Sequence, residues 1–294
     1  MTLPCSDGAR ARGDQLLATA SRVDRWLLVE QPGPWGPPTL PTARMAPELA
    51  RRLTAAAAAA GARLLLVRRP YRTPPDHSVY VADSTPGHER LLHRRLTDEE
   101  LLTEPLPFAG DGAGWEEVDG PLLLVCTHGR HDQCCAVRGR PVFDTLSAHW
   151  PDRAWECSHI GGDRFAPNVL VLPEGLYLGQ VDPAQAVPVV TALLAGRLPV
   201  AHLRGRSSRP QPVQAAEQFA RARLGRDLAD DLFPAGHRAE GANRWRVRLS
   251  GTGGRPDVEV LVRREATEHL VLLTCQSAEA KVAPVFVCEA LELL

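Results

Sequence analysis

Residues 121–135 read PLLLVCTHGRHDQCC, and this stretch decides which fold we expect. Its apolar run at 122–125 is typical of a buried β-strand. The run leads directly into Cys126 and a polar loop that ends at Cys135. Apolar residues then recur near helical spacing as far as His149, which predicts a helix. The stretch therefore predicts a strand, a loop bearing cysteines and a helix, in that order.

The segments that follow extend this pattern. They predict a brief strand at 155–157, two strands at 169–172 and 176–178, and a helix at 183–194. Pro173-Glu174-Gly175 lies between the two longer strands and indicates a hairpin. The resulting order, β–α–β–(α)–β–β–α, is typical of a thioredoxin-like fold. We expect this domain to span residues 119–210.

The N-terminal part of the chain shows a similar order of elements. It predicts a strand at 26–30, a helix at 46–60, and strands at 63–67 and 77–82. Gly61 follows the alanine-rich helix, as expected for the glycine that ends one. We therefore expect a first thioredoxin-like α/β domain over residues 1–118.

The C-terminal part predicts a small α+β appendage over residues 211–294. Its elements are a helix at 213–232 and strands at 245–249, 258–263 and 269–275. The predicted fold class is therefore α/β, with two thioredoxin-like units and this appendage.

Composition excludes several classes of protein. The 294 residues carry 34 basic and 35 acidic side chains, a net charge of −1. This balance argues against a nucleic-acid partner. Lys281 is the only lysine, so we attribute the many arginines to coding bias rather than to phosphate binding. No secretory signal and no apolar run of about 18 residues is present. We expect a cytoplasmic protein with no membrane partner.

The cysteines indicate the chemistry. There are seven, an odd number, which excludes complete pairing in disulfides. Four of them lie between Cys126 and Cys157. Clustered cysteines in a cytoplasmic protein suggest metal or redox chemistry. Cys126 and Cys135 enclose eight residues, which is too long for a zinc knuckle but suits a cluster lying under a loop. His159 and Asp163 flank a pair of glycines, whose N–H groups can approach a bulky ligand.

These motifs together resemble the sucrase/ferredoxin-like family of thioredoxin-like [2Fe-2S] proteins. The resemblance rests on Cys126-Thr-His-Gly, Asp132-x-Cys134-Cys135, Gly139-Arg-Pro, Ser158-His-Ile-Gly-Gly-Asp-Arg-Phe-Ala166, Leu172-Pro-x-Gly-x-Tyr-x-Gly179, Leu203-Arg-Gly-Arg-Ser207 and Trp26-Leu-Leu-Val-Glu-Gln-Pro-Gly-Pro-Trp-Gly36. It covers roughly residues 20–220, and the combination of motifs is specific.

The resemblance implies a set of ligands. In the family, two cysteines hold one iron and two histidines, spaced His-x3-His, hold the other. The resemblance assigns Cys126 and Cys135 to the first iron and His159 to the second. The fourth position holds Asp163 where the family has histidine. Asp163 is therefore the predicted fourth ligand of a [2Fe-2S] cluster, and its negative charge would lower the reduction potential.

Other readings of the same residues stay open. Cys134 and Cys157 are alternative sources of the fourth ligand, although a thiol packed in the core is the default interpretation of each. His128 and His131 lie in the loop, where either could support the cluster or face solvent. Asp163 could instead pair with Arg164 near a helix start. A labile cluster, or none, is a further alternative.

The predicted function is electron transfer, by a carrier rather than a stand-alone enzyme. No Gly-x-Gly-x-x-Gly follows a strand, so electrons would be exchanged with a separate redox partner protein. Alternatives are a thiol-based redox protein using Cys134 and Cys135, or a zinc-binding or metal-free module. No pair of carboxylates stands out as acid and nucleophile, so we do not expect hydrolysis of sucrose.

Overall fold

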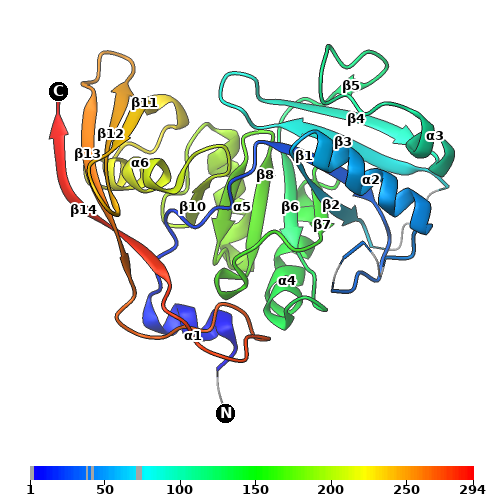
Figure 1. The fold of residues 1–294 in the computed structure, drawn as a ribbon, viewed down its shortest axis with the longest axis horizontal. Coiled ribbons are helices and arrows are strands. Elements are labelled where there is room, and N and C mark those ends of the chain that lie inside the picture. Colours follow the sequence, from blue (N-terminus) through cyan, green and yellow to red (C-terminus); the bar gives the residue numbers. More distant parts are fainter. Residues whose placement is uncertain (1–2, 38, 41–42, 71–74) are drawn as a thin grey trace. The chain divides into compact units, whose positions relative to one another are not determined.

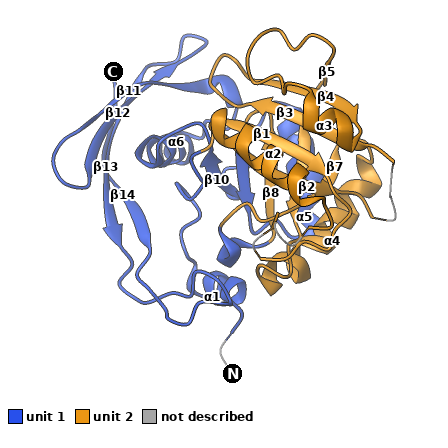
Figure 2. Ribbon diagram, turned by 45° about the vertical axis from the view of Figure 1, so that its right-hand side comes forward, with its two compact units in different colours: residues 1–22, 162–166, 176–294 blue, residues 23–161, 167–175 orange. Residues whose placement is uncertain are grey.

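The computed structural model describes residues 3–37, 39–40, 43–70 and 75–294 (Figure 1). Within it the chain forms two compact units, drawn in different colours in Figure 2. Unit 1 comprises residues 1–22, 162–166 and 176–294, and unit 2 comprises residues 23–161 and 167–175. Each unit is described separately below.

Unit 2 is built on a mixed β-sheet. Its strands are β1 (Arg25–Glu30), β2 (Ala62–Arg68), β3 (His77–Asp83), β4 (Arg90–Leu96), β5 (Glu116–Glu117), β6 (Leu122–Cys126), β7 (Ala154–Cys157) and β8 (Asn168–Leu172). Across the sheet they lie in the order β8-β6-β7-β2-β1-β3-β4-β5. The pairs β1–β2 and β6–β7 are parallel, and the other neighbours are antiparallel.

The described residues of unit 2 form the helices α2 (Pro47–Ala59), α3 (Asp98–Thr103) and α4 (Gln133–His149). Helix α2 connects the parallel strands β1 and β2, and α4 connects β6 and β7. Leu49, Leu53 and Ala57 recur every four residues, so they share one face of α2. That face is buried in a core with Leu27 and other side chains of the sheet.

The α/β class is confirmed, and the predicted order of elements occurs twice along the chain. The first series runs β1-α2-β2-β3-β4-α3. The second runs β6-α4-β7-β8 and then β9 (Leu176–Gly179) and α5 (Pro183–Leu194), which belong to unit 1. Inside unit 2 the two series meet where β2 pairs antiparallel with β7, with Val67 opposite Cys157. Residue 118, where we predicted a domain boundary, lies inside unit 2 between β5 and β6.

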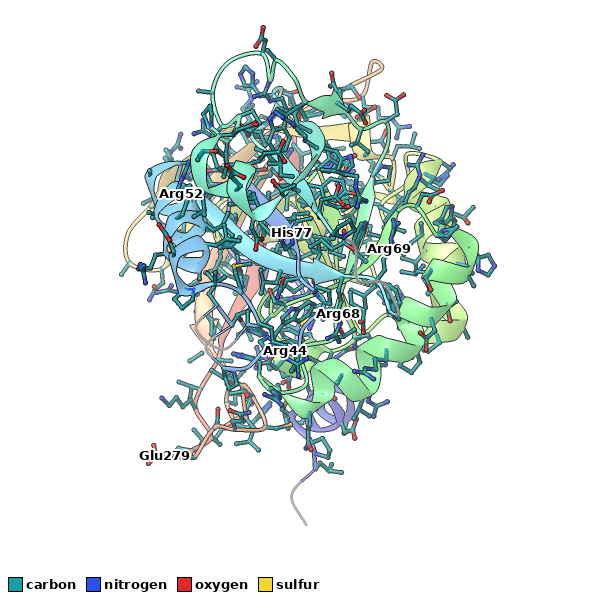
Figure 3. The ribbon with its side chains drawn as sticks, turned by 90° about the vertical axis from the view of Figure 1, so that its right-hand side faces the viewer. Arg44, Arg52, Arg68, Arg69, His77 and Glu279 are labelled. Atoms are coloured by element: carbon teal, nitrogen blue, oxygen red, sulfur yellow. The ribbon has the colours of Figure 1, made fainter. Side chains whose placement is uncertain are left out.

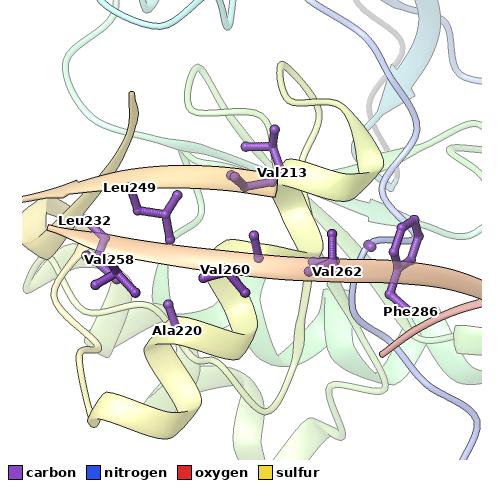
Figure 4. Close-up of a cluster of buried hydrophobic side chains, with 12 residues drawn as sticks. Val213, Ala220, Leu232, Leu249, Val258, Val260, Val262 and Phe286 are labelled. Atoms are coloured by element: carbon purple, nitrogen blue, oxygen red, sulfur yellow. The ribbon is translucent and has the colours of Figure 1, made fainter. Parts of the chain in front are cut away.

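Unit 1 contains the N-terminal helix and the C-terminal sheet. Its elements are α1 (Cys5–Arg12), η1 (Asp163–Phe165), β9 (Leu176–Gly179), α5 (Pro183–Leu194), β10 (Leu203–Arg206), α6 (Gln211–Leu224), η2 (Ala229–Asp231), β11 (Leu232–Ala239), β12 (Arg244–Gly251), β13 (Val258–Ala266) and β14 (Pro284–Leu293). Strands β11 to β14 form an antiparallel sheet in chain order. Val213 and Ala220 of α6 pack with Leu249, Val260 and Phe286 of this sheet (Figure 4).

Two sequence predictions in the appendage were wrong. The helix predicted at 213–232 ends at Leu224, because Gly225 adopts the left-handed conformation, with φ of 63°, that stops a helix. The strand predicted at 269–275 is not one of the strands of the described sheet. Its place beside β13 is taken by β14, whose partners run from Leu293 opposite Val258 to Pro284 opposite Ala266.

None of the helices formed by the described residues combines the length and the apolar character needed to cross a membrane.

Helix α3 begins with a capping box, which gives a first prediction. The Thr97 side chain accepts the Glu100 N–H at 3.3 Å, and the Glu100 carboxylate accepts the Thr97 N–H at 2.8 Å. We expect Thr97→Ala to lower the free energy of unfolding by about 1 kcal/mol, measured by urea denaturation. Thr54→Ala, on the exposed face of α2, is the control and should change it by less than about 0.5 kcal/mol. Equal effects of the two substitutions would contradict the role of the cap.

Candidate metal centre

The candidate centre lies where two parallel strands of unit 2 end. Cys126 is the last residue of β6 and pairs in register with Cys157, the last residue of β7. The Thr127 N–H donates to the Cys157 carbonyl at 3.2 Å and continues this pairing. In α/β sheets the loops at the carboxyl ends of parallel strands commonly build binding sites. The loop after β6 leads to Cys135, and the chain after β7 leads to His159.

The start of α4 brings Cys135 back to this edge. Asp132 caps the helix, its side chain accepting the Cys134 N–H at 2.8 Å, so Cys135 lies in the first turn. Gly139, one turn later, packs against the end of β6, so closely that a Cβ there would overlap the carbonyl oxygen of Cys126. The absence of a side chain at Gly139 therefore allows the helix and the strand end to meet.

Three of the predicted ligands converge in this place. The Sγ atoms of Cys126 and Cys135 and a ring nitrogen of His159 all lie within 4.8 Å of one another. Both cysteines are 1% exposed, whereas His159 is half-buried. A hydrogen bond from Cys135, followed by the hydrogen bond and charge of His159, holds the pKa of the Cys126 thiol well below its ordinary value, against the opposing effect of burial. This environment favours the thiolate, which is the form that binds metals.

Two further histidines surround His159, with different roles. His128 is buried, and its Nδ1 accepts the His159 N–H at 3.3 Å. Its Nε2 lies 3.1 Å from the Trp35 carbonyl, so this nitrogen carries the proton and donates it. Burial lowers the pKa of His128 and keeps the ring neutral. His131 instead stacks on His159, with 3.6 Å between ring centroids and 21° between ring planes.

Side chains distant in sequence hold the segment after β7 in place. Arg63 donates to the His159 carbonyl at 2.9 Å, and the Ser158 hydroxyl accepts the Leu66 N–H at 3.0 Å. Arg68, labelled in Figure 3, pairs with Glu156 at 2.6 Å. Arg63 and Arg68 could not be predicted as neighbours of β7 and the segment after it, because the pairing of β2 with β7 has no local signal in the sequence.

The three remaining predicted residues, Cys134, Cys157 and Asp163, are all buried. Cys134 is buried in the first turn of α4, and Cys157 is fully buried in β7. Burial, and then the proximity of Cys126, raise the pKa of the Cys157 thiol well above its ordinary value. Asp163 is buried at the first residue of η1 and belongs to unit 1. None of the seven cysteines, all within the described part of the chain, forms a disulfide.

The site as a whole offers two thiols and one imidazole at one edge of a sheet, with a second imidazole stacked on the first. Sulfur and imidazole donors select zinc, copper and iron–sulfur clusters over hard cations such as Mg²⁺. The fold and this donor set define a class: an α/β protein with clustered thiol and imidazole side chains after two parallel strands.

A known protein family matches most of the chain. The model of the sucrase/ferredoxin-like family matches residues 16–205, and the chain belongs to that family. No curated protein and no solved structure matches the chain. The matched range includes every residue discussed above as a predicted ligand.

Proposed function

We propose that this protein carries electrons on a [2Fe-2S] cluster, with Cys126 and Cys135 on one iron and His159 on the other. The observation that carries the proposal is the convergence of these three side chains, 33 residues apart in sequence at most, within 4.8 Å. Asp163 stands at the position where the family has histidine as the fourth ligand. When bound, the cluster would accept and release one electron at a time.

The surroundings of the three donors support this use. Cys126 and Cys135 are buried, which shields a cluster from solvent on their side. His159 is half-buried and so marks the side of the site that reaches the surface. An electron carrier needs such an asymmetric site, because electrons must pass to a separate redox partner protein through the exposed edge while the rest stays protected.

The test measures the iron and sulfide content and the spectra of the full chain after purification without oxygen. We expect two irons and two acid-labile sulfides for each chain, a coloured oxidised form, and a paramagnetic signal after reduction by one electron. Zinc in place of iron, in cells grown with ample iron, would contradict the proposal and favour a single tetrahedral ion on the same donors. A colourless protein that takes up no iron on reconstitution would also contradict it.

A further inference from the structure

We infer that His131, rather than Asp163, supplies the fourth ligand of the cluster; this inference rests on the proposed function. Its ring lies face to face with that of His159 at 3.6 Å between centroids. A ring nitrogen of His131 lies within 4.8 Å of one of His159. Because an imidazole nitrogen binds a metal in the plane of its ring, the His131 ring must rotate out of the stack to reach an iron bound by His159. His159 and His131 would then hold the second iron through two imidazoles, the ligand pair that the family has.

The backbone holds His131 in this position. The His128 carbonyl accepts two N–H groups, from His131 at 3.0 Å and from Asp132 at 3.1 Å. Asp132 is itself fixed as the cap of α4. His131 therefore belongs to a tight turn between the two cysteine ligands, and little movement of the chain is needed for its ring to turn toward a cluster.

Other side chains of unit 2 are less suited to this role. Both ring nitrogens of His128 are engaged, one by the Trp35 carbonyl and one by the His159 N–H. Cys157 lies inside the sheet, and it is not in any group of potential ligands found among the described residues. His131 is half-buried, like His159, and lies on the same side of the site.

The choice between His131 and Asp163 has a measurable consequence. With a neutral imidazole as fourth ligand, the cluster and its ligands carry one negative charge fewer than with a carboxylate. Less negative charge favours the reduced state, so the potential should be higher than an aspartate-ligated cluster would give. The identity of the fourth ligand thus sets which partners can reduce the protein.

The experiment counts histidine nitrogens on the reduced cluster. Protein grown with ¹⁵N-histidine is reduced, and pulsed electron paramagnetic resonance resolves the strongly coupled nitrogens. We expect two in the wild type, one in His131→Gln, and two in both Asp163→Asn and the control His149→Gln. His149 is exposed at the end of α4, where Nδ1 contacts the Thr145 carbonyl at 3.0 Å. Iron and sulfide are measured on every sample.

The outcomes separate this inference from the proposed function. Two coupled nitrogens in the wild type that persist in His131→Gln would overturn the role of His131. A single coupled nitrogen in the wild type would overturn it as well, even if His131→Gln does not assemble a cluster. In either case a stoichiometric iron and sulfide content would leave the proposed function intact. Absence of iron from the wild type would contradict the proposed function itself.

Discussion

Cys126→Ser and Cys135→Ser are each expected to abolish binding of iron and sulfide while the chain stays folded. Both thiols are buried and directed at the same site, and serine differs from cysteine by one atom. A hydroxyl is a hard donor that rarely ionises, so it replaces a thiolate poorly on iron. Removing a residue that only hydrogen-bonds to a metal ligand lowers metal affinity roughly 10–100-fold. Removing a direct ligand should lower the affinity further. Iron and sulfide analysis with visible absorption measures the effect.

Cys288→Ser is the matched control. Cys288 lies in β14 of unit 1, where its Sγ contacts the Ala290 carbonyl at 3.5 Å. We expect this variant to keep the iron and sulfide content of the wild type. Far-ultraviolet circular dichroism shows whether each variant is folded. If folded Cys126→Ser retained as much iron as Cys288→Ser, the assignment of the cysteine ligands would be wrong.

The sequence was sufficient to predict the local elements around the site. The apolar run before Cys126 and the helical spacing after Cys135 are short-range patterns, and the structure has β6 and α4 at these positions. Cys126 and Cys135 meet because α4 begins directly after its cap, Asp132, so that the first turn of α4 faces the end of β6. A strand, a loop and a helix within 30 residues can be predicted because each depends on neighbouring residues.

Long-range features could not be predicted in the same way. Trp35 contacts His128 across 93 residues, and Arg63 contacts His159 across 96. Both contacts depend on which strands are neighbours in the sheet, and neither apolar spacing nor turn residues encode that order. The last strand was missed for a similar reason: an edge strand such as β14 is half-exposed, so its apolar pattern is weak.

Gly139→Ala is expected to lower both the stability of the protein and its capacity for iron. In an isolated helix alanine is favoured over glycine by about 1 kcal/mol, so this substitution should stabilise α4 by itself. At this position the new Cβ would overlap the backbone carbonyl of Cys126, and backbone at a strand end cannot turn aside as a side chain can. Overpacking of this kind typically costs 1–3 kcal/mol and sometimes more, which outweighs the helical gain.

The same overlap bears on the metal centre, because relieving it moves α4 away from β6 and takes Cys135 away from Cys126. We therefore expect the iron content of Gly139→Ala to fall together with the free energy of unfolding in urea. Gly236→Ala in β11 is the control, since a Cβ there meets open space, and it should change neither quantity. If Gly139→Ala were as stable as the wild type and bound iron normally, the close contact between helix and strand end would not be what positions the two cysteines.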